Sequence, residues 1–469
     1  MKMKIFKKVL FIVIMIFIFS GVTIYGIILS KANGFDTSSD LESKLIREKN
    51  SGIKKEAISS AKKAYMYLHN RNYQQFRDMF SCEELKNCYT DDVIDFYYSY
   101  YIVGDNFKGY KDCECTIGDN EIEVKLEIKG DYRISRVLFV LDKNYKMMGM
   151  QFNPSSPLIS ESNTYIEEYF QVGEHKLEGL LTLPKGIENP PVVVLVHGSG
   201  YNNADESTFE NRPFADIAHG LAEYGVATLR YNERFYQYPE YAETNNTIYT
   251  KSIDDACMAV EQLSKDKRIN NEKIFVAGHS LGGMVVPKIA ELNTKVCGII
   301  SLAGTPISFV DSSYYQAIEE YKTSTLSDEE KEAVLQANLQ YIEKCKKIDE
   351  EGDELVEAPE GIQSYSKSYL KSMNELNTEE TLSKLDIPML ILQGKDDTQV
   401  YADIDYLEWQ RILNNRTNCS FKLYDGLNHF FMKSQGYTIS EFVQELMVPG
   451  HIDYRVIQDI GDFVNCYSK

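Results

Sequence analysis

The chain has 469 residues, of which 43% are hydrophobic and 12% aromatic, so it is long enough for two domains with ordinary hydrophobic cores. Its 50 basic and 70 acidic residues give a net charge of −20, which argues against a nucleic-acid-binding protein because phosphate binding needs basic patches. The nine cysteines cannot all pair within the chain, and we expect ordinary thiols, with a Cys82–Cys88 disulfide as the alternative.

The N-terminus has the pattern of a membrane anchor. Four lysines lie within the first eight residues and precede an apolar run from Val9 to Leu29, which is long enough to span a bilayer as a helix. The lysines predict that the N-terminus lies in the cytoplasm and that the rest of the chain is extracytoplasmic. The alternative is a signal peptide that is cleaved to release a secreted protein. We assign residues 1–31 to this anchor or signal segment and residues 32–51 to a linker.

Residues 52–153 are expected to form a small α+β domain. Apolar spacing predicts helices first and four strands afterwards; the helices cover 53–69, 73–80 and 91–101, and the strands cover 113–118, 121–129, 133–141 and 147–152. The stretch Phe76–Leu85 resembles the small domain of unknown function that precedes some bacterial secreted hydrolases, and this resemblance implies no chemistry. Asn153–Pro157, with two prolines, is expected to mark the boundary between the two domains.

Residues 158–469 alternate between strands and helices. After two strands, near 165–172 and 177–183, continuous apolar runs predict buried strands over 192–196, 226–230, 274–277, 296–302 and 389–392. This alternation predicts an α/β domain with a parallel sheet and helices on both faces. It breaks at an insert of about 305–382, which follows a strand end and is expected to form a helical cap over a ligand site. The alternative is a surface decoration remote from the site.

A histidine-glycine loop follows the first buried strand of this domain. The strand Val192–Val196 runs into His197-Gly198-Ser199-Gly200, which places a flexible loop at the carboxyl edge of the sheet. On its own this pattern is an ordinary glycine turn. If a nucleophile follows on another strand, we expect the backbone N–H of Ser199 to point at the reacting carbonyl as an oxyanion donor.

The stretch Ile274–Gly283 supplies that nucleophile. It begins as a buried strand, becomes Gly278-His279-Ser280-Leu281-Gly282 and continues into a predicted helix over 281–292. A G-x-S-x-G pattern between strand and helix indicates a nucleophile elbow, where the glycines leave room for a strained turn with the serine at its apex. Ser280 is therefore the predicted nucleophile, and the N–H of Leu281 is the predicted second oxyanion donor.

A serine hydroxyl needs a base and an acid that orients the base. A later strand leads into Gly394-Lys395-Asp396-Asp397, where the usual G-x-x-D pattern selects Asp397 rather than Asp396 as the acid. The last strand leads into a loop that carries His429, which we predict to be the base; the rival His451 lies near the C-terminal helix. Serine, then aspartate, then histidine is the chain order expected of α/β-hydrolases.

From about Tyr165 to the C-terminus, these three motifs in register make the chain similar to the α/β-hydrolase superfamily. The loop His197–Asn203 and the run Leu229–Asn232 resemble its bacterial esterases of the dienelactone-hydrolase and prolyl-oligopeptidase-like groups, in which aspartate often stands at the position of Asn232. The resemblance implies the α/β-hydrolase fold and the cleavage of small-molecule esters or acylated substrates through a Ser-His-Asp triad and an acyl-enzyme intermediate. It implies no metal or organic cofactor.

Other functions stay open beside this one. The same triad would serve a peptidase or an acyltransferase, and a hydrolase scaffold would also suit a non-catalytic binding protein. The N-terminal part is too short for the propeller of prolyl oligopeptidases, which weakens the peptidase interpretation. The leading prediction is a membrane-anchored, extracytoplasmic serine esterase, and the sequence does not fix its oligomeric state.

Overall fold

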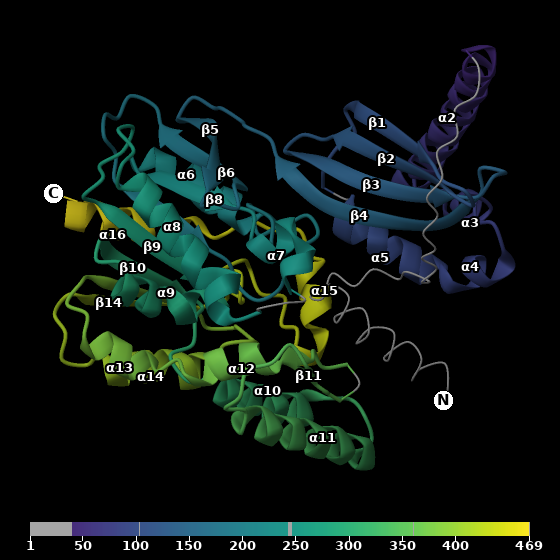
Figure 1. Cartoon of the computed structure of the whole chain (residues 1–469). Helices are drawn as coiled ribbons and strands as arrows, with labels where there is room; N and C mark the ends of the chain where they lie inside the picture. Colours follow the sequence, from purple (N-terminus) through teal and green to yellow (C-terminus); the bar gives the residue numbers. More distant parts are fainter. Residues whose placement is uncertain (1–39, 103, 243–245, 360, 469) are drawn as a thin grey trace. The chain divides into compact units, whose positions relative to one another are not determined.

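The computed structural model describes residues 40–102, 104–242, 246–359 and 361–468 (Figure 1). The predicted anchor or signal segment, residues 1–31, lies outside these residues, and among those described no helix is both long and apolar enough to cross a membrane. The structure has all nine cysteines as free thiols, without the Cys82–Cys88 disulfide. The chain folds into two compact units that adjoin in the sequence at Leu158 and Ile159.

The N-terminal unit consists of helices followed by an antiparallel sheet, as predicted. The helices are α2 (Asp40–His69), α3 (Tyr73–Arg77), α4 (Glu83–Cys88) and α5 (Asp91–Tyr101), and the strands, in sheet order, are β1 (Gly109–Ile117), β2 (Ile122–Lys129), β3 (Arg133–Leu141) and β4 (Met147–Pro157). Residues 40–51, expected to belong to a linker, form the beginning of α2. Alternate residues of β2 are buried against apolar residues of α2, which gives this unit its own core.

The expected boundary, Asn153–Pro157, belongs to a strand, because β4 continues through Pro157, and the two units divide in the sequence just after it, between Leu158 and Ile159. Ser156 pairs with Ile134 and Pro157 pairs with Arg133, after an irregularity in the register. Proline cannot donate a hydrogen bond, but β4 is an edge strand of this sheet, and an edge strand tolerates residues without an N–H on its open side.

The C-terminal unit contains an eight-stranded, mostly parallel sheet, which confirms the predicted α/β-hydrolase core. Its strands are β5 (Tyr165–Val172), β6 (Leu177–Pro184), β7 (Val192–Val196), β8 (Ala227–Tyr231), β9 (Ile274–His279), β10 (Val296–Leu302), β13 (Met389–Gly394) and β14 (Cys419–Tyr424). The order across the sheet is β14-β13-β10-β9-β7-β8-β6-β5, and only β6 and β5 pair antiparallel with their neighbours. The carboxyl ends of β7, β9, β13 and β14 therefore lie at one edge.

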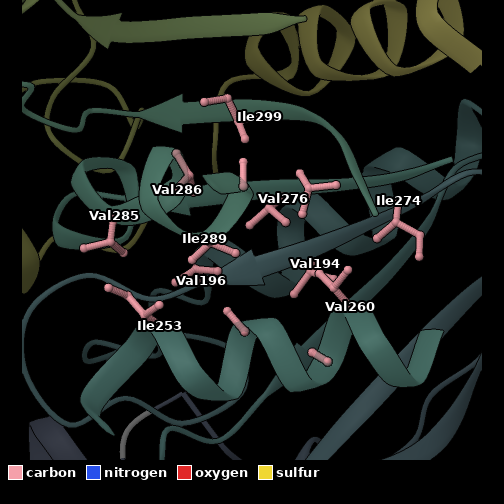
Figure 2. Close-up of a cluster of buried hydrophobic side chains, with 14 of the residues drawn as sticks. Val194, Val196, Ile253, Val260, Ile274, Val276, Val285, Val286, Ile289 and Ile299 are labelled. Carbon is pink, nitrogen blue, oxygen red and sulfur yellow. The ribbon is translucent and has the colours of Figure 1, made fainter. Parts of the chain in front are cut away.

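Helices cover both faces of this sheet, as β7 shows. Val194 and Val196 belong to the core formed with α8 (Asp254–Leu263) and α9 (Leu281–Leu292), seen in Figure 2. Val193 and Leu195 belong to the core on the other face, with α6 (Pro213–Glu223) and α16 (Tyr454–Ser468). Each fully buried aliphatic side chain contributes roughly 2 kcal/mol, so both faces hold the central strands firmly in place.

The predicted insert is largely helical. It contains α10 (Phe309–Thr323), α11 (Asp328–Lys346), the two-residue strands β11 (Leu355–Val356) and β12 (Tyr365–Ser366), α12 (Lys367–Asn374) and the start of α13 (Thr378–Ser383). Helix α11 begins with the predicted cap, in which Ser327 and Glu330 form a reciprocal capping box. The remaining short elements are α7 (Arg234–Gln237), α14 (Leu407–Ile412), α15 (Phe442–Leu446), the 3₁₀ turns η1 (Pro239–Ala242) and η4 (Ile439–Glu441), and the π-helices η2 (Tyr249–Ile253) and η3 (Ala402–Tyr406).

Candidate active site

Ser280 occupies the sharp turn between β9 and α9 that the G-x-S-x-G pattern predicts. Its backbone has φ 52° and ψ −114°, a region that residues with a side chain rarely adopt, and its N–H donates to Leu302 O at 2.8 Å. A Cβ atom on Gly278 would lie 2.2 Å from the carbonyl of Gly282, and one on Gly282 would lie 2.2 Å from Val196 O. Only glycines at both positions allow the strand, the turn and the helix to approach this closely.

Asp397 and His429 meet at the same edge of the sheet, after β13 and β14. Oδ2 of Asp397 accepts a hydrogen bond from His429 Nδ1 at 2.8 Å, and both side chains are buried. Because an ionised carboxylate can only accept, this contact assigns the imidazole proton to Nδ1 and leaves Nε2 free to act as a base. The neighbouring Asp396 is exposed, so the structure brings the predicted acid, and not its neighbour, to the predicted base.

Further donors hold the Asp397 carboxylate in place. Oδ1 accepts from the backbone N–H groups of Gln399 at 2.7 Å and Val400 at 3.0 Å. Oδ2, besides His429, accepts from Nε2 of Gln393 at 2.9 Å. The carboxylate therefore has every lone pair directed at a donor, which fixes its orientation toward the imidazole.

The link between Ser280 and the Asp397–His429 pair runs through His279. Nε2 of His279 donates to His429 O at 3.1 Å, and the two imidazole rings are 4.8 Å apart between centroids. Among the hydrogen bonds of the described residues, none joins the Ser280 hydroxyl to His429. The structure thus brings the residue beside the predicted nucleophile into contact with the predicted base, and the proton-transfer contact itself stays a prediction.

A buried carboxylate lies on the other side of His279. Glu206 Oε2 is 3.0 Å from His279 Nδ1, and Glu206 Oε1 accepts from the N–H of Gly198 at 2.6 Å. Burial by itself lowers the pKa of His279, but Glu206 outweighs it and the pKa is raised; burial raises the pKa of Glu206, but His279 outweighs it and the pKa is lowered. This buried contact therefore connects the loop of Gly198 to the elbow of Ser280.

Residues 197–202, here called the oxyanion loop, pass directly beside Ser280. A Cβ atom on Gly198 would lie 3.2 Å from Ser280 Cβ. The His197 ring is buried, its Nε2 donates to Asn203 O at 3.0 Å, and burial lowers its pKa to about 4. Ser199 follows Gly198 on this loop, and Leu281 follows Ser280 at the start of α9; the role of their N–H groups as oxyanion donors stays a prediction.

The rival base His451 lies elsewhere. Its side chain is 88% exposed and its Nδ1 contacts Asp216 at 3.0 Å, so it is a surface residue. The predicted cap contacts the loop that carries Asp397, because Gln316 of α10 donates from Nε2 to Gln399 O at 2.9 Å.

Within the described ranges, no group of three or more histidine, cysteine, aspartate or glutamate residues could hold a metal ion.

Sequence reasoning missed several buried charges around the oxyanion loop. Besides Glu206, these are Glu233, which follows β8, and Lys251 of η2, whose Nζ lies 2.8 Å from Glu233 Oε1. Burial raises the pKa of Glu233 to about 7, although Lys251 lowers it. Its place in the sequence could have revealed Glu233, because it lies just after the end of strand β8, at the edge where ligands bind in α/β sheets.

Comparisons with known proteins show the family of this chain. A family described as "Serine aminopeptidase, S33" matches residues 189–435. Esterase EstD of Thermotoga maritima is 31% identical over 331 residues, which cover 69% of this chain and 75% of EstD. Among solved structures, Est1E from Butyrivibrio proteoclasticus is 18% identical, with 60% of this chain and 96% of Est1E covered and a TM-score of 0.38. An esterase of Pyrobaculum calidifontis is 14% identical, with 66% and 87% covered and a TM-score of 0.41.

Proposed function

Because the chain belongs to the serine aminopeptidase S33 family and is an esterase of the α/β-hydrolase fold, we propose that it cleaves carboxylic esters through a Ser280–His429–Asp397 triad. The observation that carries the proposal is the buried 2.8 Å hydrogen bond from His429 Nδ1 to Asp397, at the sheet edge where Ser280 occupies its strained turn. This arrangement supplies a base with a free Nε2 and a nucleophile raised out of the sheet.

In the first half of the reaction, His429 Nε2 takes the proton of the Ser280 hydroxyl while the oxygen attacks the ester carbonyl. Asp397 stabilises the imidazolium that forms and does not take its proton. The negative oxygen of the tetrahedral intermediate is held by the backbone N–H groups of Ser199 and Leu281. Each such donor is worth on the order of 3 kcal/mol. The intermediate collapses as His429 protonates the departing alcohol, which leaves an acyl group on Ser280.

In the second half, water replaces the alcohol. His429 deprotonates this water, the hydroxide adds to the acyl carbon, and the same two N–H groups hold the new oxyanion. Collapse of this intermediate releases the carboxylic acid and returns the proton to Ser280. The Ser280–His429 hydrogen bond that the first half requires is expected to form when substrate is bound, since catalytic hydrogen bonds often reach their working geometry only in that complex.

The test is the Ser280→Ala variant, assayed with short p-nitrophenyl esters and with a fluorophosphonate probe. We expect hydrolysis to fall by at least about 10³-fold and labelling to disappear. Ser420→Ala is the matched control, because Ser420 is an exposed residue of β14, and we expect it to behave as the wild type. Labelling of the Ser280→Ala protein at the wild-type rate would place the nucleophile elsewhere.

A peptidase is the second candidate, because the matching family is named for a serine aminopeptidase. The same triad would cleave an activated amide, so the two activities are separated by their substrates. We expect kcat/KM for p-nitrophenyl esters to exceed that for aminoacyl p-nitroanilides by orders of magnitude. A larger kcat/KM for the anilides would favour the peptidase.

We also propose that the enzyme acts outside the cytoplasm while held to the membrane by residues 9–29. The support is the run of apolar residues after four lysines, together with the lysine bias toward one side of it. The test is the location of the full chain after cell fractionation and its sensitivity to protease added to intact cells. Recovery in the cytosolic fraction, protected from protease, would contradict the proposal, and recovery in the medium would favour the cleaved form.

A further inference from the structure

Three backbone groups of the oxyanion loop are bonded to buried charged side chains. The N–H of Gly198 donates to Glu206, Gly200 O accepts from Lys251 Nζ at 2.5 Å, and the N–H of Asn202 donates to Glu233 Oε2 at 3.0 Å. Within the part of the chain that the structure describes, no acceptor contacts the N–H of Ser199, which lies between these anchored groups. The loop is thus held by hydrogen bonds on both sides of the Ser199 N–H.

Lys251 and Glu233 form a buried ion pair that contacts this loop. Lys251 Nζ lies 2.8 Å from Glu233 Oε1, and their side chains are only 7% and 3% exposed. Glu233 uses its second oxygen for Asn202, and Lys251 uses another proton for Gly200, so each charge bonds both to its partner and to the loop. Lys251 reaches this position from η2, a π-helix, and irregular turns of this kind are frequent at functional sites.

Stability alone does not account for such a pair. Removing two charges from water carries a large penalty, and replacing a buried ion pair by apolar residues of similar size is often neutral or stabilising. What an apolar pair could not do is accept from Asn202 N–H and donate to Gly200 O at the same time. The loop would lose both anchors, although the fold around it would keep its packing.

We propose that the Glu233–Lys251 ion pair positions the oxyanion loop, so that the Ser199 N–H is held where the oxyanion forms. The inference rests on the proposed function, and it makes Glu233 and Lys251 positioning residues that do not touch the substrate. Losing an oxyanion donor outright lowers kcat by about 10²–10³-fold. Loosening one is expected to lower kcat by about 10- to 100-fold, with KM changed less than about threefold, because the donor acts on the transition state more than on the bound ester.

The experiment uses the full chain at pH 8, above the pKa of Glu233 (about 7), so that the wild-type pair is charged. The main variant is the double substitution Lys251→Met/Glu233→Gln, which removes both charges and leaves neither one unpaired. The control is Lys295→Met/Glu261→Gln, which removes an ion pair whose side chains are 42% and 44% exposed on the same unit. Kinetics with p-nitrophenyl esters are compared with the melting temperature and with inhibition by a trifluoromethyl ketone, whose adduct with serine carries an oxyanion.

We expect the main variant to melt within a few degrees of the wild type, to lose kcat by 10- to 100-fold and to lose affinity for the ketone by a similar factor, while the control keeps all three values. An unchanged kcat would overturn the proposal. So would a fall in kcat that comes with an equally large rise in KM and a clear fall in melting temperature. If the double variant is not recovered folded, the same comparison with Glu233→Gln decides. Its amide oxygen still accepts from Asn202, but its NH₂ group then faces Lys251, so the ion pair is lost and the same fall in kcat is expected; wild-type kcat would overturn the proposal. An active Ser280→Ala protein would overturn the proposed function instead, so the two failures are distinguishable.

Discussion

Replacing Asp397 with asparagine is the sharpest test of the proposed triad, and the structure predicts how the substitution acts. The two backbone N–H groups on Oδ1, from Gln399 and Val400, require an oxygen there. The new NH₂ group must then take the place of Oδ2, facing Gln393 and His429. Gln393 Nε2 keeps two other acceptors, Gly394 O and Val400 O at 3.0 Å each, so the conflict falls on the imidazole.

To accept from this NH₂ group, His429 must move its proton from Nδ1 to Nε2, and it then has no lone pair for the Ser280 proton. The wrong tautomer lowers kcat by about 10⁴-fold in the serine protease template, which corresponds to about 5 kcal/mol of transition-state stabilisation. We therefore expect Asp397→Asn to lower kcat for p-nitrophenyl acetate at pH 8 by about 10³- to 10⁴-fold, with a small change in KM. The matched control is Asp396→Asn, on the exposed neighbour, which is expected to stay within about twofold of the wild type.

Both proteins are to be compared by thermal unfolding, since Asp397 also accepts structural hydrogen bonds. A larger loss of kcat for Asp396→Asn, or equal losses for the two variants, would show that the wrong carboxylate was assigned. An Asp397→Asn protein that stays folded and keeps wild-type kcat would refute the argument from the tautomer.

Three other substitutions test the site and its surroundings. His429→Ala should abolish ester hydrolysis while His451→Ala stays within about twofold, and comparable losses would reopen the choice of base. Gly282→Ala places a Cβ atom 2.2 Å from a backbone oxygen and should lower the melting temperature and the activity together, whereas Gly149→Ala, with no atom within 4 Å of its Cβ, should not. Burial raises the pKa of Glu445 from 4.5 to about 7, so between these values the folded protein holds a proton that the unfolded chain has lost, and stability falls as the pH rises. Glu445→Gln should therefore raise the free energy of unfolding by about 2 kcal/mol at pH 8 and hardly at pH 4, and equal effects at both pH values would contradict this reasoning.

Local patterns were sufficient to predict the elements that carry the candidate site. Helix α9 and strand β10 have the predicted bounds, because their apolar residues are continuous and the elbow glycines mark where the strand must turn. The choice of Asp397 over Asp396 rested on a spacing pattern, and the structure supplies its physical basis: one carboxylate is buried among donors, and the other is exposed. The roles of these residues in a reaction remain a proposal.

Features that depend on distant neighbours could not be predicted. The strand through Pro154 and Pro157 is possible only because β4 lies at an edge, and strand order is not visible in a single sequence. Lys251 lies 51 positions from Gly200 in the sequence, and nothing in the surrounding residues distinguishes a lysine that binds a buried carbonyl from one that is solvated. A buried charge becomes recognisable only when its partners are known.

The asparagine at position 232, where the resemblance to bacterial esterases led us to expect aspartate, fits this network of buried charges. Asn232 Oδ1 accepts from the N–H of Ala204 at 2.8 Å, a bond that either residue type could accept. An aspartate would place a buried negative charge on the residue that precedes Glu233, whose pKa burial and Glu206 already raise to about 7. A further increase would leave Glu233 protonated at neutral pH and remove the charge that holds Lys251. The neutral amide therefore keeps the backbone hydrogen bond and protects the ionisation of Glu233, on which the position of the oxyanion loop depends.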